Sequence, residues 1–234
     1  MHTPHTTSTL TVLSDVSVLG AILDAAHTNG FIVAKLRMCC SAPGALASAV
    51  PELGESKTDF GDVVAALEIV GEGAVERWQE VAAGSDWGGT VHCCASEAAA
   101  RAAIGVFFGG DAGGVLATSA RLGAGNGTLC LVKPTAVKQG KTGPMIGAIM
   151  AQGLVVTAAD MFTLDRAAAD EFFDVYRGVL SGMEHAEAMK ELTSGRMVAL
   201  EVSGRAGQTQ AEVVNTFRDV SLKGEGGWVG ERGT

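Results

Sequence analysis

The sequence contains few aromatic residues and few prolines. Its 234 residues include one Tyr, three Trp, eight Phe and five Pro, but 32 Gly. Hydrophobic residues make up 47% of the chain and charged residues 18%, which is typical of a globular protein rather than a disordered one. We therefore expect compact domains whose cores are rich in Ala and Gly and thinly packed.

The sequence also lacks an excess of basic residues. The net charge is -9; residues 1–110 carry 5 Lys and Arg against 12 Asp and Glu, and residues 111–234 carry 12 against 14. Proteins that bind nucleic acid usually present a basic face, so we expect no nucleic-acid partner. An acidic first half also repels a nucleoside triphosphate unless specific cations offset the repulsion.

Long apolar runs and a disulfide pattern are missing too. No run reaches the ~20 residues of a membrane span, and the first residues show no basic segment followed by an apolar core. The five cysteines occur as Cys39-Cys40, Cys93-Cys94 and Cys130, an odd number without the spacing of a disulfide framework. The sequence predicts a soluble, cytoplasmic protein with reduced thiols and no membrane partner.

What the sequence does contain is an internal repeat. Three segments recur in the same order: Thr9–Leu13 as Thr128–Val132, Asn29–Met38 as Gln152–Met161, and Ala65–Ile69 as Val198–Val202. The offset between the copies increases along the chain, so the first copy lacks residues that the second keeps. The chain is long enough for two domains of about 100 to 120 residues. We infer a duplicated domain whose copies have lost different segments.

Strands and helices alternate in both copies. Predicted strands are 9–13, 31–40, 62–70, 89–94, 128–133, 154–162 and 197–203, and predicted helices are 18–28, 72–83, 97–108, 143–151, 166–176, 182–193 and 208–218. The order βαββαβ predicts an α/β (α+β) fold of ferredoxin-like type, with a four-stranded antiparallel sheet covered by helices on one face.

These elements divide the chain into four parts. We assign residues 8–108 to a first, internally shortened domain, 109–127 to a Gly-rich linker, 128–220 to a second, C-terminally truncated domain, and 221–234 to an irregular tail. A sheet with helices on one face leaves its other face apolar. We therefore expect the helix-free faces of the two sheets to pack against each other.

His92 is the candidate nucleophile. It lies near the end of a predicted strand, just before a helix that Ser96 is expected to cap. A neutral imidazole is a good nucleophile near pH 7, and the amides at a helix N-terminus stabilise a phosphate. A lone His at a strand end is more often structural, so the residues alone leave both interpretations open.

Lys133 is the candidate phosphate-binding cation. It closes the first strand of the second copy, from where a lysine can reach a phosphate in the adjacent crevice, although a solvated lysine is the commoner explanation. The equivalent position in the first copy is Ser14. Gly140–Gly143 looks like the end of a phosphate-binding loop, but the glycine that this motif requires at position 135 is Thr.

Cys93 and Cys94 beside His92 raise the question of a metal site. Adjacent strand residues point to opposite faces, so one ion cannot easily take both thiolates. We therefore expect no metal and interpret these cysteines as small buried hydrophobic groups.

Several segments resemble the nucleoside diphosphate kinase family in order and spacing. They are Thr128–Val137, Gln152–Val156, Glu171–Tyr176 and Ser194–Leu200 in the second copy, and His92–Ser96 with Phe107-Phe108 in the first. The tandem arrangement and the segment 172–179 look most like a ciliary branch of the family, found on the axonemal doublet microtubule.

The resemblance implies phosphate transfer between nucleoside triphosphates and diphosphates through a phosphohistidine, with Mg and ATP as cofactors if the chain is active. By position, His92 would be the phosphohistidine and Lys133 a nucleotide-binding lysine, but they lie in different copies. Phe173 stands in place of a tyrosine and Ala103 in place of a carboxylate, and 83–89 is too short for the loop that brings arginines and a threonine. We therefore expect a degraded active site.

A degraded site favours a structural or interaction protein over an enzyme. The resemblance implies a place in the cilium or flagellum axoneme, with axonemal tubulin or microtubule inner proteins as partners and nucleotide binding left open. The alternative is a nucleoside diphosphate kinase, or a fragment of one, whose missing parts reflect an incomplete sequence.

Overall fold

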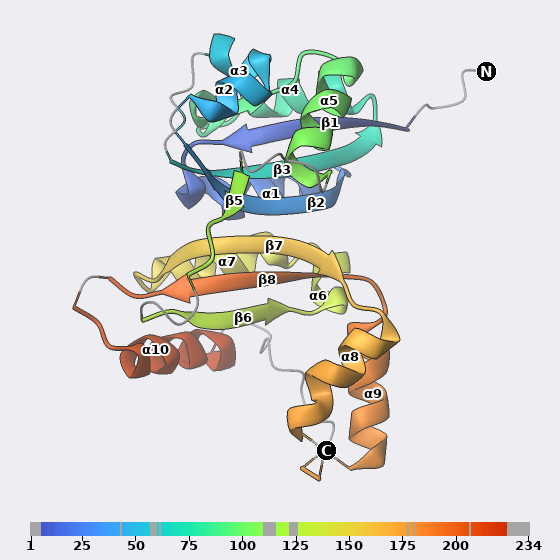
Figure 1. Cartoon of the computed structure of the whole chain (residues 1–234), viewed down its shortest axis with the longest axis vertical. Helices are drawn as coiled ribbons and strands as arrows, with labels where there is room; N and C mark the ends of the chain where they lie inside the picture. The colour runs from blue at the N-terminus through green and yellow to red at the C-terminus, as the bar shows by residue number, and fades with distance from the viewer. Residues whose placement is uncertain are drawn as a thin grey trace.

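The computed structural model describes residues 6–42, 44–56, 60, 62–109, 116–121, 126–176, 178–179, 181–205 and 207–223. Within them, eight strands of different lengths form one antiparallel sheet, and helices pack around it (Figure 1). None of the helices in these ranges combines the length and apolarity that a bilayer crossing requires.

The first copy contains the predicted alternation and two additional short helices. Its elements are β1 (Thr6–Leu13), η1 (Val16–Val18), α1 (Leu19–Thr28), β2 (Ile32–Ser41), α2 (Ala45–Ala49), α3 (Pro51–Glu55), β3 (Val63–Glu72), α4 (Ala74–Ala83), η2 (Gly88–Thr90), β4 (Val91–Cys93) and α5 (Glu97–Phe108). The strands pair in the order β4-β1-β3-β2, all antiparallel, as the order βαββαβ predicts. The helices α2 and α3 were not predicted, because five residues are too few to show a helical period.

The second copy repeats this plan with three strands in the described residues. Its elements are β6 (Thr128–Val132), α6 (Pro134–Lys138), α7 (Thr142–Ala151), β7 (Val155–Thr163), α8 (Arg166–Phe173), η3 (Asp174–Tyr176), α9 (Gly182–Leu192), β8 (Arg196–Ser203) and α10 (Gln210–Lys223). The strand order is β7-β8-β6. By the repeat, β6, α7, β7 and β8 correspond to β1, α1, β2 and β3.

Two segments differ from the sequence prediction. Helix α10 continues to Lys223, so the irregular tail does not begin at 221; Val213 and Phe217 pack it against the sheet. Inside the predicted linker, β5 (Leu116–Thr118) pairs with Cys39–Ser41 of β2. Residues 110–115, 122–125 and 224–234 lie outside the described residues.

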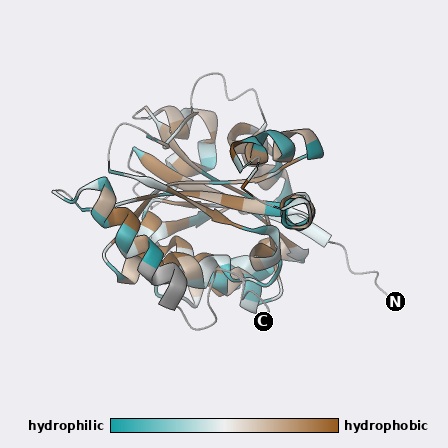
Figure 2. Ribbon diagram, turned by 90° about the horizontal axis from the view of Figure 1, so that it is seen from below, coloured by the Kyte–Doolittle hydropathy of each residue, from teal (hydrophilic) through white to brown (hydrophobic). Residues whose placement is uncertain are grey.

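Helices cover both faces of the first copy's sheet, so the prediction of one covered face is wrong there. Leu36 and Leu67 face α1 and α4, whereas Val12 and Ala66 face the opposite side, where α2, α3 and α5 pack. Strand side chains alternate between the faces, which sends neighbouring residues into different cores. Figure 2 shows the sheet edge-on between two helical layers.

The two copies meet edge to edge, and not face to face as expected. Strands β2 and β7 lie side by side, paired at Arg37 and Asp160, and join the two sheets into one (Figure 1). Nε of Arg37 lies 3.5 Å from Oδ2 of Asp160, and its Nη1 donates a hydrogen bond of 3.0 Å to the carbonyl of Phe107. Because helices already cover both faces of the first sheet, the unpaired backbone N–H and C=O groups at the edge of β2 are what remains to bind a partner strand.

Helices α1 and α7 pack closely beside this strand pair. A Cβ on Gly143 would lie 2.6 Å from the carbonyl oxygen of Gly20 and 2.7 Å from the amide nitrogen of Asp24. Since α7 and β7 are the repeats of α1 and β2, the contact between the copies approximates a two-fold symmetric one. Gly143, the last residue of the apparent phosphate-binding motif, thus serves helix packing.

We predict that Gly143→Ala destabilises the protein by about 1 to 3 kcal/mol, because the added methyl forces α1 and α7 apart. Gly147→Ala, in the same helix, is the matched control: its Cβ would meet nothing within 4 Å, and alanine should stabilise the helix by up to about 1 kcal/mol. Urea unfolding of both variants measures the difference. Equal effects would contradict the packing role of Gly143.

Candidate functional site

His92 lies in the middle of β4 and is largely buried. It pairs with Val12 of β1, and directly opposed residues of antiparallel strands share a face, so its imidazole points to the side where α3 packs. The side chain is 15% exposed, and its Nε2 lies 3.5 Å from Oε2 of Glu52. The predicted nucleophile is therefore held between the sheet and an acidic residue.

Several described residues near β4 have structural contacts of their own. Ala103 is buried, as an apolar core residue. The short connection before β4 contributes Trp87, which stacks on Trp78 with ring centroids 5.8 Å apart. Ser14 donates a hydrogen bond of 3.2 Å to the carbonyl of Thr90. The prediction that Ser96 caps the following helix is confirmed, since its side chain accepts from the amide of Ala99.

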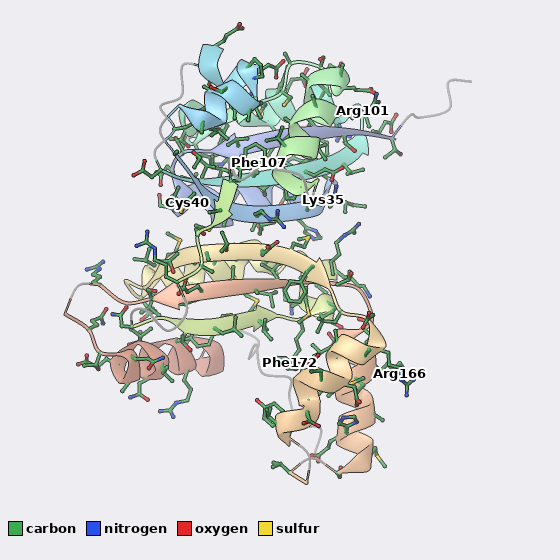
Figure 3. The ribbon with its side chains drawn as sticks, in the orientation of Figure 1. Lys35, Cys40, Arg101, Phe107, Arg166 and Phe172 are labelled. Atoms are coloured by element: carbon green, nitrogen blue, oxygen red, sulfur yellow. The ribbon has the colours of Figure 1, made fainter. Side chains whose placement is uncertain are left out.

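Three described cations of the first copy have partners of their own. Nζ of Lys35 lies 2.9 Å from Oε2 of Glu68, Arg37 contacts Asp160, and the guanidinium of Arg77 lies 4.7 Å from the ring centre of Phe31. Arg101 is exposed on α5, toward the outside of the molecule (Figure 3). None of these contacts, all made by described residues, places a cationic side chain beside His92.

Lys133 lies in a different setting, at the N-terminus of α6 directly after β6. It is exposed and lines a cavity of about 360 Å³ together with residues of α8, η3 and α9: Phe172, Phe173, Tyr176, Ala188, Glu191 and Leu192, with Leu131 from the strand. The ring centres of Phe173 and Tyr176 are 6.1 Å apart. Figure 3 shows Phe172 on the arm formed by α8 and α9, at the opposite end of the molecule from Arg101.

Glu191 is the acidic residue that lines this cavity, and no pattern in the sequence indicates it. Its carboxylate accepts hydrogen bonds of 3.0 and 2.7 Å from the amide and hydroxyl of Thr135. Burial raises the pKa of Glu191, but the bonds from Thr135 and the charges of Lys133 and Lys138 outweigh it and leave the pKa below its ordinary value. The positive charge of Lys133 is thus partly offset by a neighbouring carboxylate.

The structure does not bring His92 and Lys133 together. Their strands, β4 and β6, are the two outermost strands in the order β4-β1-β3-β2-β7-β8-β6. With ~4.8 Å between neighbouring strands, the two positions are separated by roughly 29 Å across the sheet. A phosphate bound near Lys133 is out of reach of the imidazole of His92.

A second cavity, of about 540 Å³, lies where the two copies meet. Residues from both copies line it, among them His27, Phe31 and Ile32 from the first and Lys138, Met161 and Arg196 from the second. Nζ of Lys138 donates a hydrogen bond of 2.8 Å to the carbonyl of Ser194. The sequence could not predict this cavity, because it depends on how the copies are joined.

The cysteines are free thiols and mostly buried, as predicted. Burial raises the pKa of the Cys39, Cys94 and Cys130 thiols to about 12, and Glu52 adds to the effect at Cys94. The same alternation places Cys94 on the face of His92. One ligand atom each from Glu52, His92 and Cys94 falls within 4.8 Å of the others.

Comparison with known proteins points to one family. The sequence model of the nucleoside diphosphate kinase family matches residues 126–223. The chain is 28% identical over 233 residues to nucleoside diphosphate kinase homolog 7 of Rattus norvegicus, an alignment that covers 87% of this chain and 56% of the relative. It is 32% identical over 108 residues to the nucleoside diphosphate kinase of Cutibacterium acnes, covering 46% of this chain and 75% of the relative.

A solved structure is also similar over part of the chain. It is the nucleoside diphosphate kinase of Aquifex aeolicus, with a TM-score of 0.37 and 22% identity, covering 45% of this chain and 97% of that one. The chain spans about half the length of its rodent relatives, 56% in both rat and mouse.

We predict an alkaline loss of stability that depends on Cys130. An exposed thiol ionises near pH 9, whereas burial raises the pKa of Cys130 to about 12. Between these values the unfolded state loses the proton that the folded state keeps, so the free energy of unfolding falls as pH rises, by at most about 1.4 kcal/mol per pH unit. The difference in the free energy of unfolding between wild type and Cys130→Ala should be constant from pH 7 to 8. At pH 10 wild type should have lost stability relative to the variant. Urea unfolding at the three pH values measures it, and a constant difference up to pH 10 would contradict the burial effect.

Proposed function

The chain belongs to the nucleoside diphosphate kinase family, and we propose that it acts within this family as a scaffold with a degraded active site rather than as a phosphotransferase. Membership follows from the bacterial relative, which is 32% identical and covered over 75% of its length. We propose further that the scaffold belongs to the ciliary axoneme, on the doublet microtubule, with tubulin or microtubule inner proteins as partners. This part of the proposal is supported by the tandem resemblance, which extends over 87% of the chain to the rodent homologs.

The observation that carries the proposal is the separation of His92 from Lys133. Phosphate transfer depends on holding the nucleophile in line with the phosphate while cations stabilise the charge of the transition state. Each such group contributes orders of magnitude to the rate. His92 and Lys133 lie on opposite outer strands. The nucleophile therefore has no lysine beside it to stabilise the phosphate charge, and a phosphate bound by the lysine has no histidine in line with it.

The surroundings of each residue support the same conclusion. Beside His92, the carboxylate of Glu52 at 3.5 Å would repel an approaching phosphate. Beside Lys133, Phe173 has no hydroxyl, although Tyr176 in the same cavity has one, and Glu191 adds negative charge to the cavity. Neither half thus contains a complete set of catalytic groups among its described residues.

The arm formed by α8, η3 and α9 offers a surface for docking. It projects away from the sheet (Figure 1), and Val175, Val179 and Met183 on it are 78%, 75% and 75% exposed. Large exposed apolar patches mark protein interaction sites, and these three side chains lie close together in the sequence. A scaffold needs such surfaces, whereas it does not need an intact nucleotide site.

We predict that the protein forms little phosphohistidine. Incubation with Mg and ATP labelled at the terminal phosphate should give an initial rate at least about 10³-fold below that of the Cutibacterium acnes kinase assayed in parallel, because the contacts of the described residues bring no cationic group to His92. Acid-labile label should be equally low in wild type and in His92→Ala. Labelling near one phosphate per chain that disappears in His92→Ala would favour the alternative, a phosphotransferase.

We predict that the protein remains on axonemes through mild detergent extraction and is released as salt increases. The acidic first half should contribute to docking through electrostatic attraction, and raising the salt from about 0.1 M to about 0.5 M screens it. Fractionation followed by blotting measures the bound share. Recovery in the detergent-soluble fraction, with no enrichment on axonemes, would contradict the ciliary assignment.

We predict that the double variant Val175→Asp with Val179→Asp lowers axonemal retention about tenfold, because charged groups would replace apolar contacts in the interface. Val214→Asp on α10 is the matched control, since Val214 is 39% exposed but lies off the arm. Retention of tagged proteins in the same fractionation compares them. Equal retention of all three proteins would remove the arm from the proposed interface.

A further inference from the structure

His92 and Cys94 point to the same face of the sheet. They are two residues apart at the end of β4, and the amide of Cys94 donates a hydrogen bond of 3.1 Å to the carbonyl of Leu10. Both side chains lie on the face where α2, α3 and α5 pack, and Cys94 is fully buried there. Cys93 points the other way, with its Sγ 3.7 Å from Oγ1 of Thr11.

Glu52 brings a third ligand from α3. Its Oε2 and the Nε2 of His92 are both buried, and neither atom makes a hydrogen bond of good geometry among the described residues, although the carboxylate of Glu52 also interacts with the thiol of Cys94. Buried polar atoms without a partner are rare and call for an explanation such as an ion. With Sγ of Cys94, the three ligand atoms lie within 4.8 Å of one another.

The distance between Oε2 and Nε2 distinguishes two explanations. It is 3.5 Å, longer than the 2.7–2.9 Å of a charge-assisted hydrogen bond. Two ligands at about 2.0 to 2.1 Å from a tetrahedral ion are roughly 3.4 Å apart. The spacing therefore fits two ligands of one ion better than a direct contact between the side chains.

We propose that Glu52, His92 and Cys94 bind a zinc ion, with the fourth position open to water. A set of one carboxylate, one imidazole and one thiolate suits Zn²⁺, whereas Mg²⁺ and Ca²⁺ prefer oxygen ligands only. The two negative ligands balance the charge of the ion, so the buried carboxylate is neutralised. The ion ties α3 to β4.

This site does not rest on the proposed scaffold function, although it occupies the histidine that a phosphotransferase would need. Zinc binding and phosphohistidine formation are measured separately, so each proposal can fail without the other. In the proposed site the ion would bind Nε2 of His92, the ring nitrogen that faces Glu52.

The test is a cobalt titration of the full chain after treatment with a chelator. Co²⁺ takes the place of Zn²⁺ and reports a bound thiolate by a sulfur-to-metal band in the near ultraviolet. We expect one equivalent to bind, with the band lost in Cys94→Ser and displaced by added Zn²⁺. Cys93→Ser is the matched control, since this adjacent thiol faces the other side of the sheet, and it should keep the full band.

Two further measurements keep the proposal testable if Cys94→Ser does not fold. Glu52→Gln, at a partly exposed position, should lower the cobalt affinity more than about tenfold. Zn²⁺ should raise the melting temperature of wild type but not of Glu52→Gln, because only a folded-state ligand stabilises the fold. No sulfur-to-metal band, an unchanged melting temperature, or a band that Cys93→Ser removes as well as Cys94→Ser would overturn the proposal.

Discussion

The contact between β2 and β7, with α1 and α7 packed beside it, is the constraint on which the rest of the structure depends. It joins the two inner edges of the copies into one continuous sheet. Once these edges are joined, β4 and β6 must become the outer strands. The separation of His92 from Lys133 is therefore a consequence of how the copies meet.

Much of the fold could be predicted from the sequence, because its elements are long and locally patterned. The helix 97–108 matches α5 at both ends, since Ser96 fixes its start and glycine follows its end. The contact between the copies could not be predicted. It depends on whether the copies meet through an open face or an open edge. The face is covered by α5 together with α2 and α3, and the two short helices cannot be recognised from the sequence.

The candidate site was predicted in part. Alternation along β4 correctly excluded Cys93 and Cys94 as ligands of one ion, but the same rule places His92 and Cys94 on one face. Glu52 completes the cluster from a position forty residues earlier in the chain. A contact between residues so far apart in sequence follows from tertiary packing alone, and no local pattern announces it.

The covalent connection between the copies changes how their contact can evolve. Two halves held on one chain meet at an effective concentration in the millimolar range, so a contact too weak to hold separate chains together stays closed. The contact needs no tight-binding residues, and it does not depend on how much protein the cell makes. Each half is also free to lose segments that the other keeps, because identical subunits are no longer required to satisfy both sides of the interface at once.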